Sequence, residues 1–270
     1  MDGFRDYDKA ADAVRETYKM GRLHQTYDFA LERIAEYEGR PKVQMKVWDA
    51  MALLENFIDS SDPDISIPNL YHLFQTAEAM RADNQPEWMQ VVGLIHDLGK
   101  IMYVWGSDET GTSVSNQWAI VGDTFVTGCK IPDSIVYAEF NSLNPDMDNT
   151  VRSEPYGIYK ANQGLMSCVC SWGHDEYMYR VLRSNAVDLP PEALYIVRFH
   201  SLYVHHREGG YTHLMDGFDH KMLDQLKLFN SYDLYTKMDM DKADLPAYYA
   251  RVKPYYERLV SKYLGDILWF

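Results

Sequence analysis

The sequence has few cysteines, no long apolar run and no excess of basic residues. Its 270 residues include only Cys129, Cys168 and Cys170, too few and too unevenly placed for a disulfide framework. No apolar run approaches the roughly 20 residues that span a bilayer, and the start of the chain has no signal-peptide pattern. We therefore expect a cytoplasmic protein that does not enter a membrane.

Positive charge is also scarce. The formal net charge of −14 argues against nucleic acid, an anionic membrane surface or a large polyanionic substrate as the main partner. No linker rich in Gly, Ser or Pro divides the chain, and its 46% of hydrophobic residues can bury a substantial core. These features predict a single domain over residues 1–270. They leave the oligomeric state open, and a monomer is compatible with them.

Apolar residues recur at helical spacing along most of the chain, which predicts an all-α fold. Residues 7–38 are predicted as one long helix, and Asn69 is expected to cap the start of another. Residues 106–128 are rich in Gly, Ser and Thr and are expected to form a loop. Further helices are expected at residues 43–58, 163–182, from Pro190 onward, at 217–234 and at 248–264.

Residues 91–100 carry polar side chains inside an apolar helix that is predicted to begin at Pro86. Val92, His96 and Lys100 are spaced by four residues, so they would share one face of that helix. A buried histidine next to a buried aspartate is costly unless each is paired or binds a metal. His96 and Asp97 therefore form either a hydrogen-bonded core pair or part of a metal site.

The rest of the chain favours the metal site. Further candidate ligands lie on predicted helices, mostly among apolar residues, and these are His72, His174, His200 and Asp233. With His96 and Asp97 they make a set of imidazoles and carboxylates without thiolates, which disfavours structural zinc and suits iron, manganese or another catalytic transition metal. This set exceeds the needs of one open site, so we predict two metals bridged by Asp97.

The other histidines are predicted to lie outside the site. His205 and His206 precede Arg-Glu-Gly-Gly, and adjacent histidines in such a polar loop are usually solvated. The same interpretation applies to His24, His213 and His220.

The order His … His-Asp … Asp is typical of the HD-domain superfamily, whose members bind one or two metals in an all-helical fold. Two blocks are more specific: Ser171-Trp-Gly-His-Asp-Glu-Tyr177 and Asp233-Leu-Tyr-Thr-Lys237. With further matching segments, the sequence resembles the myo-inositol oxygenase family in order and over nearly its whole length. These segments are residues 59–64, 74–78, 92–102, 117–125, 196–201 and 229–237.

The resemblance implies a reaction and a set of site residues. The implied reaction oxidises myo-inositol with O2 to D-glucuronate, opening the ring between C1 and C6 at a mixed-valent Fe(II)/Fe(III) pair. One iron would be held by His72, His96, Asp97 and Asp233, and the other by Asp97, His174 and His200. Lys100 would hold a substrate hydroxyl and assist its deprotonation. The implied substrate contacts are Arg5, Asp59, Ser60, Ser61, Lys100, Gly122, Asp123, His200, Ser201 and Lys237.

A metal-dependent phosphohydrolase is the alternative prediction, because many HD proteins direct a metal-bound hydroxide at phosphorus. Such a site needs Arg and Lys side chains to neutralise phosphate. The chain offers Lys100 and Lys237 but no arginine cluster beside the ligands. A catalytically silent metal-binding protein would have lost a ligand, whereas all the expected ligands are present. The oxygenase is therefore the preferred prediction.

Overall fold

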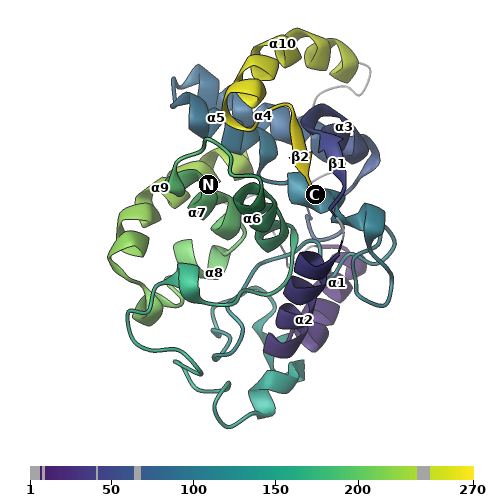
Figure 1. Ribbon diagram of the computed structural model, residues 1–270. Coiled ribbons are helices and arrows are strands. Elements are labelled where there is room, and N and C mark those ends of the chain that lie inside the picture. The colour runs from purple at the N-terminus through teal and green to yellow at the C-terminus, as the bar shows by residue number, and fades with distance from the viewer. Residues whose placement is uncertain (1–6, 8–9, 41, 64–67, 236–243) are drawn as a thin grey trace.

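The computed structural model describes the chain except for residues 1–6, 8–9, 41, 64–67 and 236–243. Its α-helices are α1 (Asp12–His24), α2 (Tyr27–Gly39), α3 (Val47–Ala52), α4 (Asn69–Ala82), α5 (Glu87–Ile95), α6 (His174–Ser184), α7 (Pro191–Phe199), α8 (Tyr203–His206), α9 (Gly217–Tyr235) and α10 (Leu245–Tyr263). The 3-10 helices are η2 (Leu53–Asn56), η3 (Leu98–Trp105), η4 (Ala138–Leu143), η5 (Pro145–Asp148), η6 (Leu165–Ser167) and η7 (Thr212–Leu214). The strands β1 (Gln44–Lys46) and β2 (Ile267–Trp269) pair antiparallel, with Gln44 opposite Trp269. The predicted all-α fold is confirmed (Figure 1).

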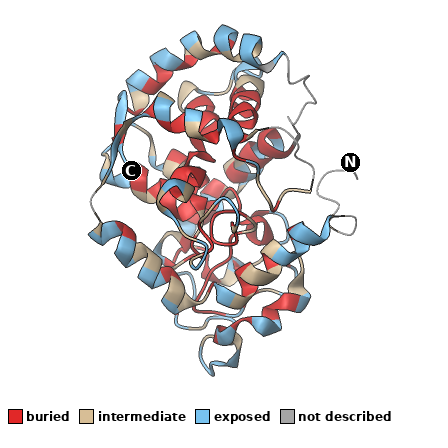
Figure 2. Ribbon diagram, turned by 90° about the vertical axis from the view of Figure 1, so that its right-hand side faces the viewer, coloured by how far each residue is buried: buried red, intermediate tan, exposed pale blue. Residues whose placement is uncertain are grey.

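The core lies where the central helices meet. Helix α4 packs against α5 and α9, and α7 packs against α5, α6 and α9. Buried apolar side chains form one connected cluster that runs from Tyr37 in α2 to Phe270 at the end of the chain. Figure 2 shows the buried residues gathered in the middle of the molecule, with exposed faces around them. The single domain over residues 1–270 stays a prediction. Within the described ranges, no helix is long and apolar enough to cross a membrane.

The predicted single helix at residues 7–38 is wrong, because the chain breaks between α1 and α2. The Gln25 side chain is buried, and its amide makes hydrogen bonds with the backbone N–H and carbonyl of Trp172. The Thr26 hydroxyl accepts a hydrogen bond from the Phe29 N–H at 3.1 Å and so caps the start of α2. Apolar periodicity continues across the break, whereas these polar contacts decide where each helix ends.

The predicted helix through Lys100 also divides. Helix α5 ends at Ile95, and after Asp97 the chain continues as the 3-10 helix η3. A 3-10 helix has three residues per turn, so Lys100 does not continue the helical face that carries His96. Gly99 explains the close approach at this point, because a Cβ there would lie 2.1 Å from the carbonyl oxygen of His174 at the start of α6.

Two other predicted helices differ in extent. The segment predicted as a helix at residues 163–182 becomes helical only at His174, after the short η6. The segment at 43–58 divides into β1, α3 and η2, because β1 pairs with the last strand of the chain. Helices α7, α9 and α10 agree with their predicted positions.

Gly99→Ala is expected to destabilise the protein. The added Cβ would meet the His174 backbone at 2.1 Å and Met178 Cβ at 3.0 Å, so η3 and α6 would have to separate. Overpacking of this kind costs about 1–3 kcal/mol or more in the free energy of unfolding, measured by denaturant titration. Gly39→Ala is the control, because nothing lies within 4 Å of a Cβ at that exposed helix end. Equal stability of the Gly99→Ala variant and the unsubstituted protein would contradict the close packing of η3 on α6.

Candidate di-metal site

All the side chains predicted as metal ligands meet in the core. Each is buried, and they come from the first turn of α4, the α5–η3 junction, the first residue of α6, the residue after α7, and the last turn of α9. In chain order they are His72, His96, Asp97, His174, His200 and Asp233. The packed helices hold most of the backbone that carries these side chains, and the loop at Ile120 holds His174.

One group of ligand atoms surrounds a point between α4, α5 and α9. Asp233 Oδ1 lies 2.9 Å from His72 Nε2 and 3.3 Å from His96 Nε2. Asp97 Oδ2 lies 4.0 Å from His72 Nε2 and 3.7 Å from His96 Nε2. His72, His96 and Asp233 therefore form a group that could hold a metal, and Asp97 Oδ2 lies beside it; mixed nitrogen and oxygen ligands of this kind suit a transition metal.

A second group lies on the other side of Asp97. Its Oδ1 is 3.1 Å from His174 Nε2 and 3.6 Å from His200 Nε2, and the two imidazole nitrogens are 3.1 Å apart. The two oxygens of Asp97 thus face different groups, with Oδ2 toward the first and Oδ1 toward the second. This is the arrangement that a carboxylate bridge between two metals requires.

Three of the histidine ligands, His96, His174 and His200, are oriented by backbone carbonyls so that Nε2 faces these groups. The Nδ1–H of His96 donates to the Gly93 carbonyl at 2.9 Å, and that of His200 donates to the Val197 carbonyl at 2.9 Å. His174 makes the same kind of bond, to Ile120. A ring whose Nδ1–H is used in this way has its Nε2 free to bind a metal, which is the usual support of a histidine ligand.

The electrostatics of the second group favour a cation. Burial opposes a charge on His174, but the carboxylates of Asp175 and Asp97 outweigh it and raise the pKa of His174 to about 10. The site therefore stabilises a positive charge at His174 Nε2, supplied by either a proton or a metal.

Ligands about 2.1 Å from a metal lie about 3 Å apart when they subtend a right angle. The separations in the two groups, from 2.9 to 4.0 Å, fit bound metals with modest adjustment.

Asp175 belongs to the site although the sequence did not single it out. Its Oδ1 lies 2.7 Å from His174 Nε2 and 3.7 Å from His200 Nε2, so it completes a triad that could hold a metal. Its Oδ2 accepts hydrogen bonds from the Thr124 hydroxyl and the Ser201 N–H. The sequence signal was a second His-Asp pair, which repeats His96-Asp97.

Asn69 is a second residue whose role differs from the prediction. Pro68 occupies the N-cap position of α4, and Asn69 is the first helical residue. Its amide Nδ2 donates to Asp97 Oδ2 at 2.8 Å, so the side chain orients the carboxylate between the two groups instead of capping the helix. Hydrogen bonds to a ligating carboxylate fix its orientation.

Lys100 is buried between two carboxylates. Its Nζ donates to Asp59 Oδ2 at 2.7 Å and to Asp97 Oδ2 at 2.8 Å. Burial opposes the charge on this lysine, but the two carboxylates outweigh it and raise the pKa of Lys100. The ammonium is therefore held as a hydrogen-bond donor. A lysine near metal cations needs either negative charge beside it or a depressed pKa, and here the two carboxylates supply the negative charge.

A cavity opens onto these groups. Its described lining includes most of the predicted substrate contacts, namely Asp59, Ser61, Lys100, Gly122, His200 and Ser201, together with Tyr203 and the ligands on both sides. Ser61 is fixed by hydrogen bonds from its N–H and its hydroxyl to Asp59 Oδ1. The free space is about 20 Å³, room for about one or two waters. A bound polyol therefore requires the lining side chains to move apart.

The remaining predicted contacts are placed differently. Ser60 and Asp123 are not among the described residues that line this cavity. The Ser60 hydroxyl lies 3.3 Å from that of Thr17, and Asp123 Oδ1 accepts from the Tyr18 hydroxyl at 2.9 Å. Arg5 and Lys237 lie outside the described residues.

The discounted pair His205 and His206 is buried, so the prediction of a solvated loop is wrong. Both residues lie in α8, where His205 bonds to the Gly210 carbonyl and His206 to the His200 carbonyl. Burial lowers the pKa of His206 to about 3 and keeps the ring neutral. Neither residue belongs to the groups of described side chains that could hold a metal.

Comparison with known proteins gives consistent matches along the chain. The sequence model of the family described as Myo-inositol oxygenase matches residues 11–270. The chain is 43% identical to an inositol oxygenase of Dictyostelium discoideum, over 99% of this chain and 90% of that protein. It is 42% identical to inositol oxygenase 1 of Arabidopsis thaliana, over 98% of this chain and 83% of that protein. The identity to an inositol oxygenase of Bos taurus is 42%, over 99% and 90%.

Proposed function

The chain belongs to the myo-inositol oxygenase family, and we propose that it oxidises myo-inositol with O2 to D-glucuronate by opening the ring between C1 and C6. The observation that carries the mechanism is the position of Asp97, whose two oxygens face two separate sets of histidine and aspartate ligands. We propose iron at both positions, because mixed nitrogen and oxygen ligands suit it and sulfur ligands are absent from the set. When bound, the iron pair would supply Lewis acidity toward a substrate hydroxyl and a redox-active site for O2, while the electrons that reduce O2 come from myo-inositol.

The residues of the chain would bind and orient the polyol. An inositol carries no charge, so its recognition depends on hydrogen-bond donors and acceptors. The Lys100 ammonium offers a donor, Asp59 offers an acceptor, and the Ser61 hydroxyl offers both. Lys100 Nζ would donate to the substrate oxygen as that oxygen loses its proton, which stabilises the negative charge that develops there.

The surroundings of the cavity would exclude water from the reaction. Lys100, Ser61 and the ligand side chains are all buried, and Tyr203 closes part of the lining. Removing water strengthens the electrostatic interactions inside the site and protects reactive species from side reactions. We propose that Gly122 and Ser201 complete the substrate-binding surface, as the resemblance implied.

The alternative phosphohydrolase finds less support in the lining. Among the described residues around the cavity, Lys100 is the only lysine or arginine, and both Asp59 and Asp97 already pair with it. A phosphate group would therefore have the metals as its only cationic partners, without the free Arg or Lys side chain that such a site needs. A neutral polyol needs no additional cation, so it fits the charges of this lining better.

The test of the proposed reaction is oxygen uptake by the iron-loaded protein with myo-inositol, measured together with D-glucuronate formation. We expect uptake that requires myo-inositol and matches the glucuronate formed one to one. A parallel screen of phosphate esters should show no metal-dependent hydrolysis. Protein that holds two irons and consumes no O2 with myo-inositol would contradict the proposal.

We also propose a cytoplasmic location. The three cysteines are free and buried, and burial raises the pKa of Cys129 and Cys168 to about 12. Buried thiols with a raised pKa are unreactive. Free cysteines without disulfides are typical of a reducing compartment such as the cytoplasm. The net charge of −14 supports small molecules, and not nucleic acid, as the partners.

A further inference from the structure

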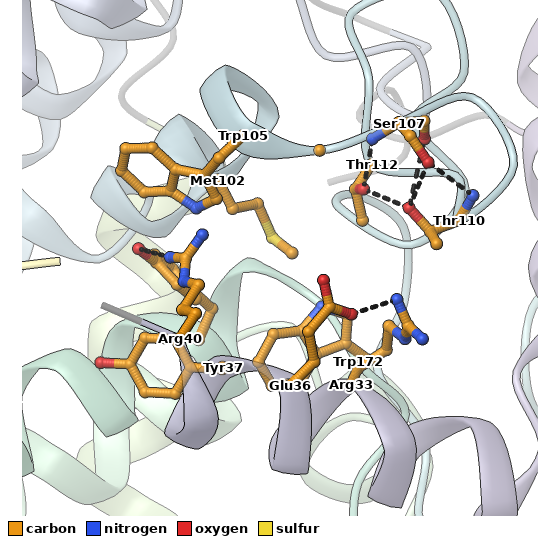
Figure 3. A pocket seen from close by; sticks show the side chains of 12 residues that line it. Arg33, Glu36, Tyr37, Arg40, Met102, Trp105, Ser107, Thr110, Thr112 and Trp172 are labelled. Atoms are coloured by element: carbon orange, nitrogen blue, oxygen red, sulfur yellow. Dashed lines mark hydrogen bonds and ion pairs between the residues drawn. The ribbon is translucent and has the colours of Figure 1, made fainter. Parts of the chain in front are cut away.

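A second cavity, of about 140 Å³, lies between α2, η3 and the loop that follows η3 (Figure 3). None of the predicted metal ligands lines it. Aromatic rings form much of its wall, from Tyr37, Trp105, Trp172 and Tyr177. Hydroxyl groups of the loop form another part, from Ser107, Thr110 and Thr112.

Two arginines of α2 and its C-terminal end give the cavity a cationic side. The Nε atoms of Arg33 and Arg40 are buried and have no hydrogen-bond partner in the described part of the chain. Arg33 forms an ion pair with Glu36, which also lines the cavity. Among the described residues no carboxylate pairs with Arg40, which donates to the Tyr177 hydroxyl at 3.2 Å. A buried donor without a partner is costly, so these atoms indicate a missing acceptor.

The surroundings of Arg40 show what the acceptor would be. Its guanidinium lies 4.7 Å from the centre of the Trp105 ring and 5.5 Å from that of Tyr37. A guanidinium held between aromatic rings keeps its planar fork in one orientation, which suits the paired oxygens of a carboxylate or phosphate. The chain as a whole has a net charge of −14, so two arginines in the lining of one cavity are an exception that a bound anion would explain.

We propose that this cavity binds a small organic anion, a carboxylate or phosphate carried on a hydroxylated ring of sugar size. Arg40 would hold the anionic group, the aromatic wall would pack against the ring, and Thr110 and Thr112 would bind its hydroxyls. One water needs about 10–15 Å³, so a cavity of 140 Å³ holds on the order of ten non-hydrogen atoms. The inference goes beyond the proposed oxygenase reaction, whose substrate is neutral.

The cavity lies next to segments of the metal site. Met102, in its lining, follows Lys100 by two residues in η3, and Trp172 precedes His174 by two residues. A ligand in contact with both side chains would restrain the segments that place Lys100 and His174. Binding at this cavity can be measured without turnover, so its outcome is separate from that of the oxygenase test.

The first test is isothermal titration calorimetry on the metal-loaded protein under anaerobic conditions with saturating myo-inositol, so that the active site is already filled. The probes are D-glucuronate, glucose 6-phosphate and uncharged D-glucose. We expect at least one anion to bind about tenfold or more tightly than glucose, because charged hydrogen bonds are stronger than neutral ones. The tighter anion identifies carboxylate or phosphate as the preferred group. Equal binding of the three probes, or no binding, would overturn the proposal.

Two substitutions with opposite expected effects locate the site. Arg40→Leu should weaken binding of the preferred anion about tenfold or more by removing its charged donor. Glu36→Gln should strengthen binding of the same anion about threefold or more, because Arg33 loses a competing carboxylate. Arg81→Leu is the matched control, since Arg81 stacks on Tyr255 at 3.7 Å and pairs with Glu78, outside the cavity.

A general loss of folding would weaken binding in both cavity variants, so opposite shifts cannot come from misfolding. Thermal unfolding of each variant is recorded alongside the titration. Unchanged affinity in Arg40→Leu, or shifts of the same sign in Arg40→Leu and Glu36→Gln, would contradict the assignment of the anion to this cavity.

Discussion

Asp97→Ala is expected to release both metals and abolish oxygenase activity. The two carboxylate oxygens of Asp97 face different ligand groups, at 3.7 Å from His96 Nε2 and 3.1 Å from His174 Nε2. Loss of a hydrogen-bonding partner behind a ligand already lowers metal affinity about 10- to 100-fold, and loss of a shared ligand should exceed this at both positions. Metal content after gel filtration, measured by mass spectrometry, is the direct readout.

Asp233→Ala provides the matched comparison. Asp233 lies close to His72 and His96 and lines only the first ligand group, so its removal should weaken one metal and spare the other. We therefore expect about one metal per chain in Asp233→Ala and none in Asp97→Ala. Thermal unfolding of the apo forms separates metal loss from misfolding. Retention of two metals by a folded Asp97→Ala variant would show that this carboxylate is not a bridge.

Lys100→Met is expected to lower kcat/KM for myo-inositol about 10²- to 10³-fold, the range found when one hydrogen-bond donor to developing negative charge is removed. The methionine keeps much of the buried stem but removes the ammonium that lies 2.7 Å from Asp59 and 2.8 Å from Asp97. If the ammonium acts on charge that develops during reaction, kcat should fall more than KM rises. Steady-state oxygen uptake at varied myo-inositol concentration measures both.

A second variant separates this role from stability. Lys100→Met leaves Asp59 without its cation, and breaking a buried ion pair costs about 3–5 kcal/mol of stability. Burial raises the pKa of Asp59, whereas Lys100 lowers it and prevails, so the pair depends on the charge of the lysine. The double variant Lys100→Met/Asp59→Asn should regain stability and remain inactive. Recovery of activity with stability would show that Lys100 is only structural.

The sequence predicted the ligand set because charged or polar residues within apolar helices can be recognised from their sequence neighbours alone. His96 and Asp97 lie in an apolar segment, and Asp233 continues an apolar helical stripe, so both carboxylates stand out as buried charges. The structure brings these residues together with His72, His174 and His200. That the two oxygens of Asp97 face opposite groups depends on its side-chain rotation, which periodicity cannot give.

The residues that were missed act through long-range contacts. Asn69 has the residue type and position of a helix cap, and only the approach of Asp97 from the next helix gives its amide another partner. Asp175 follows His174 as Asp97 follows His96, but its place beside His200 arises from the packing of α6 on α7. The backbone breaks near Gln25 and Gly99 likewise depend on contacts with Trp172 and His174.

The most direct test of the metal site is anomalous diffraction at the iron absorption edge from crystals of the iron-loaded protein. The bridged site predicts two peaks about 3.5–4 Å apart, one on each side of Asp97. The first peak should lie among His72, His96 and Asp233, and the second beside His174 and His200. A single peak, or a second peak that Asp97 does not contact, would contradict the bridged pair.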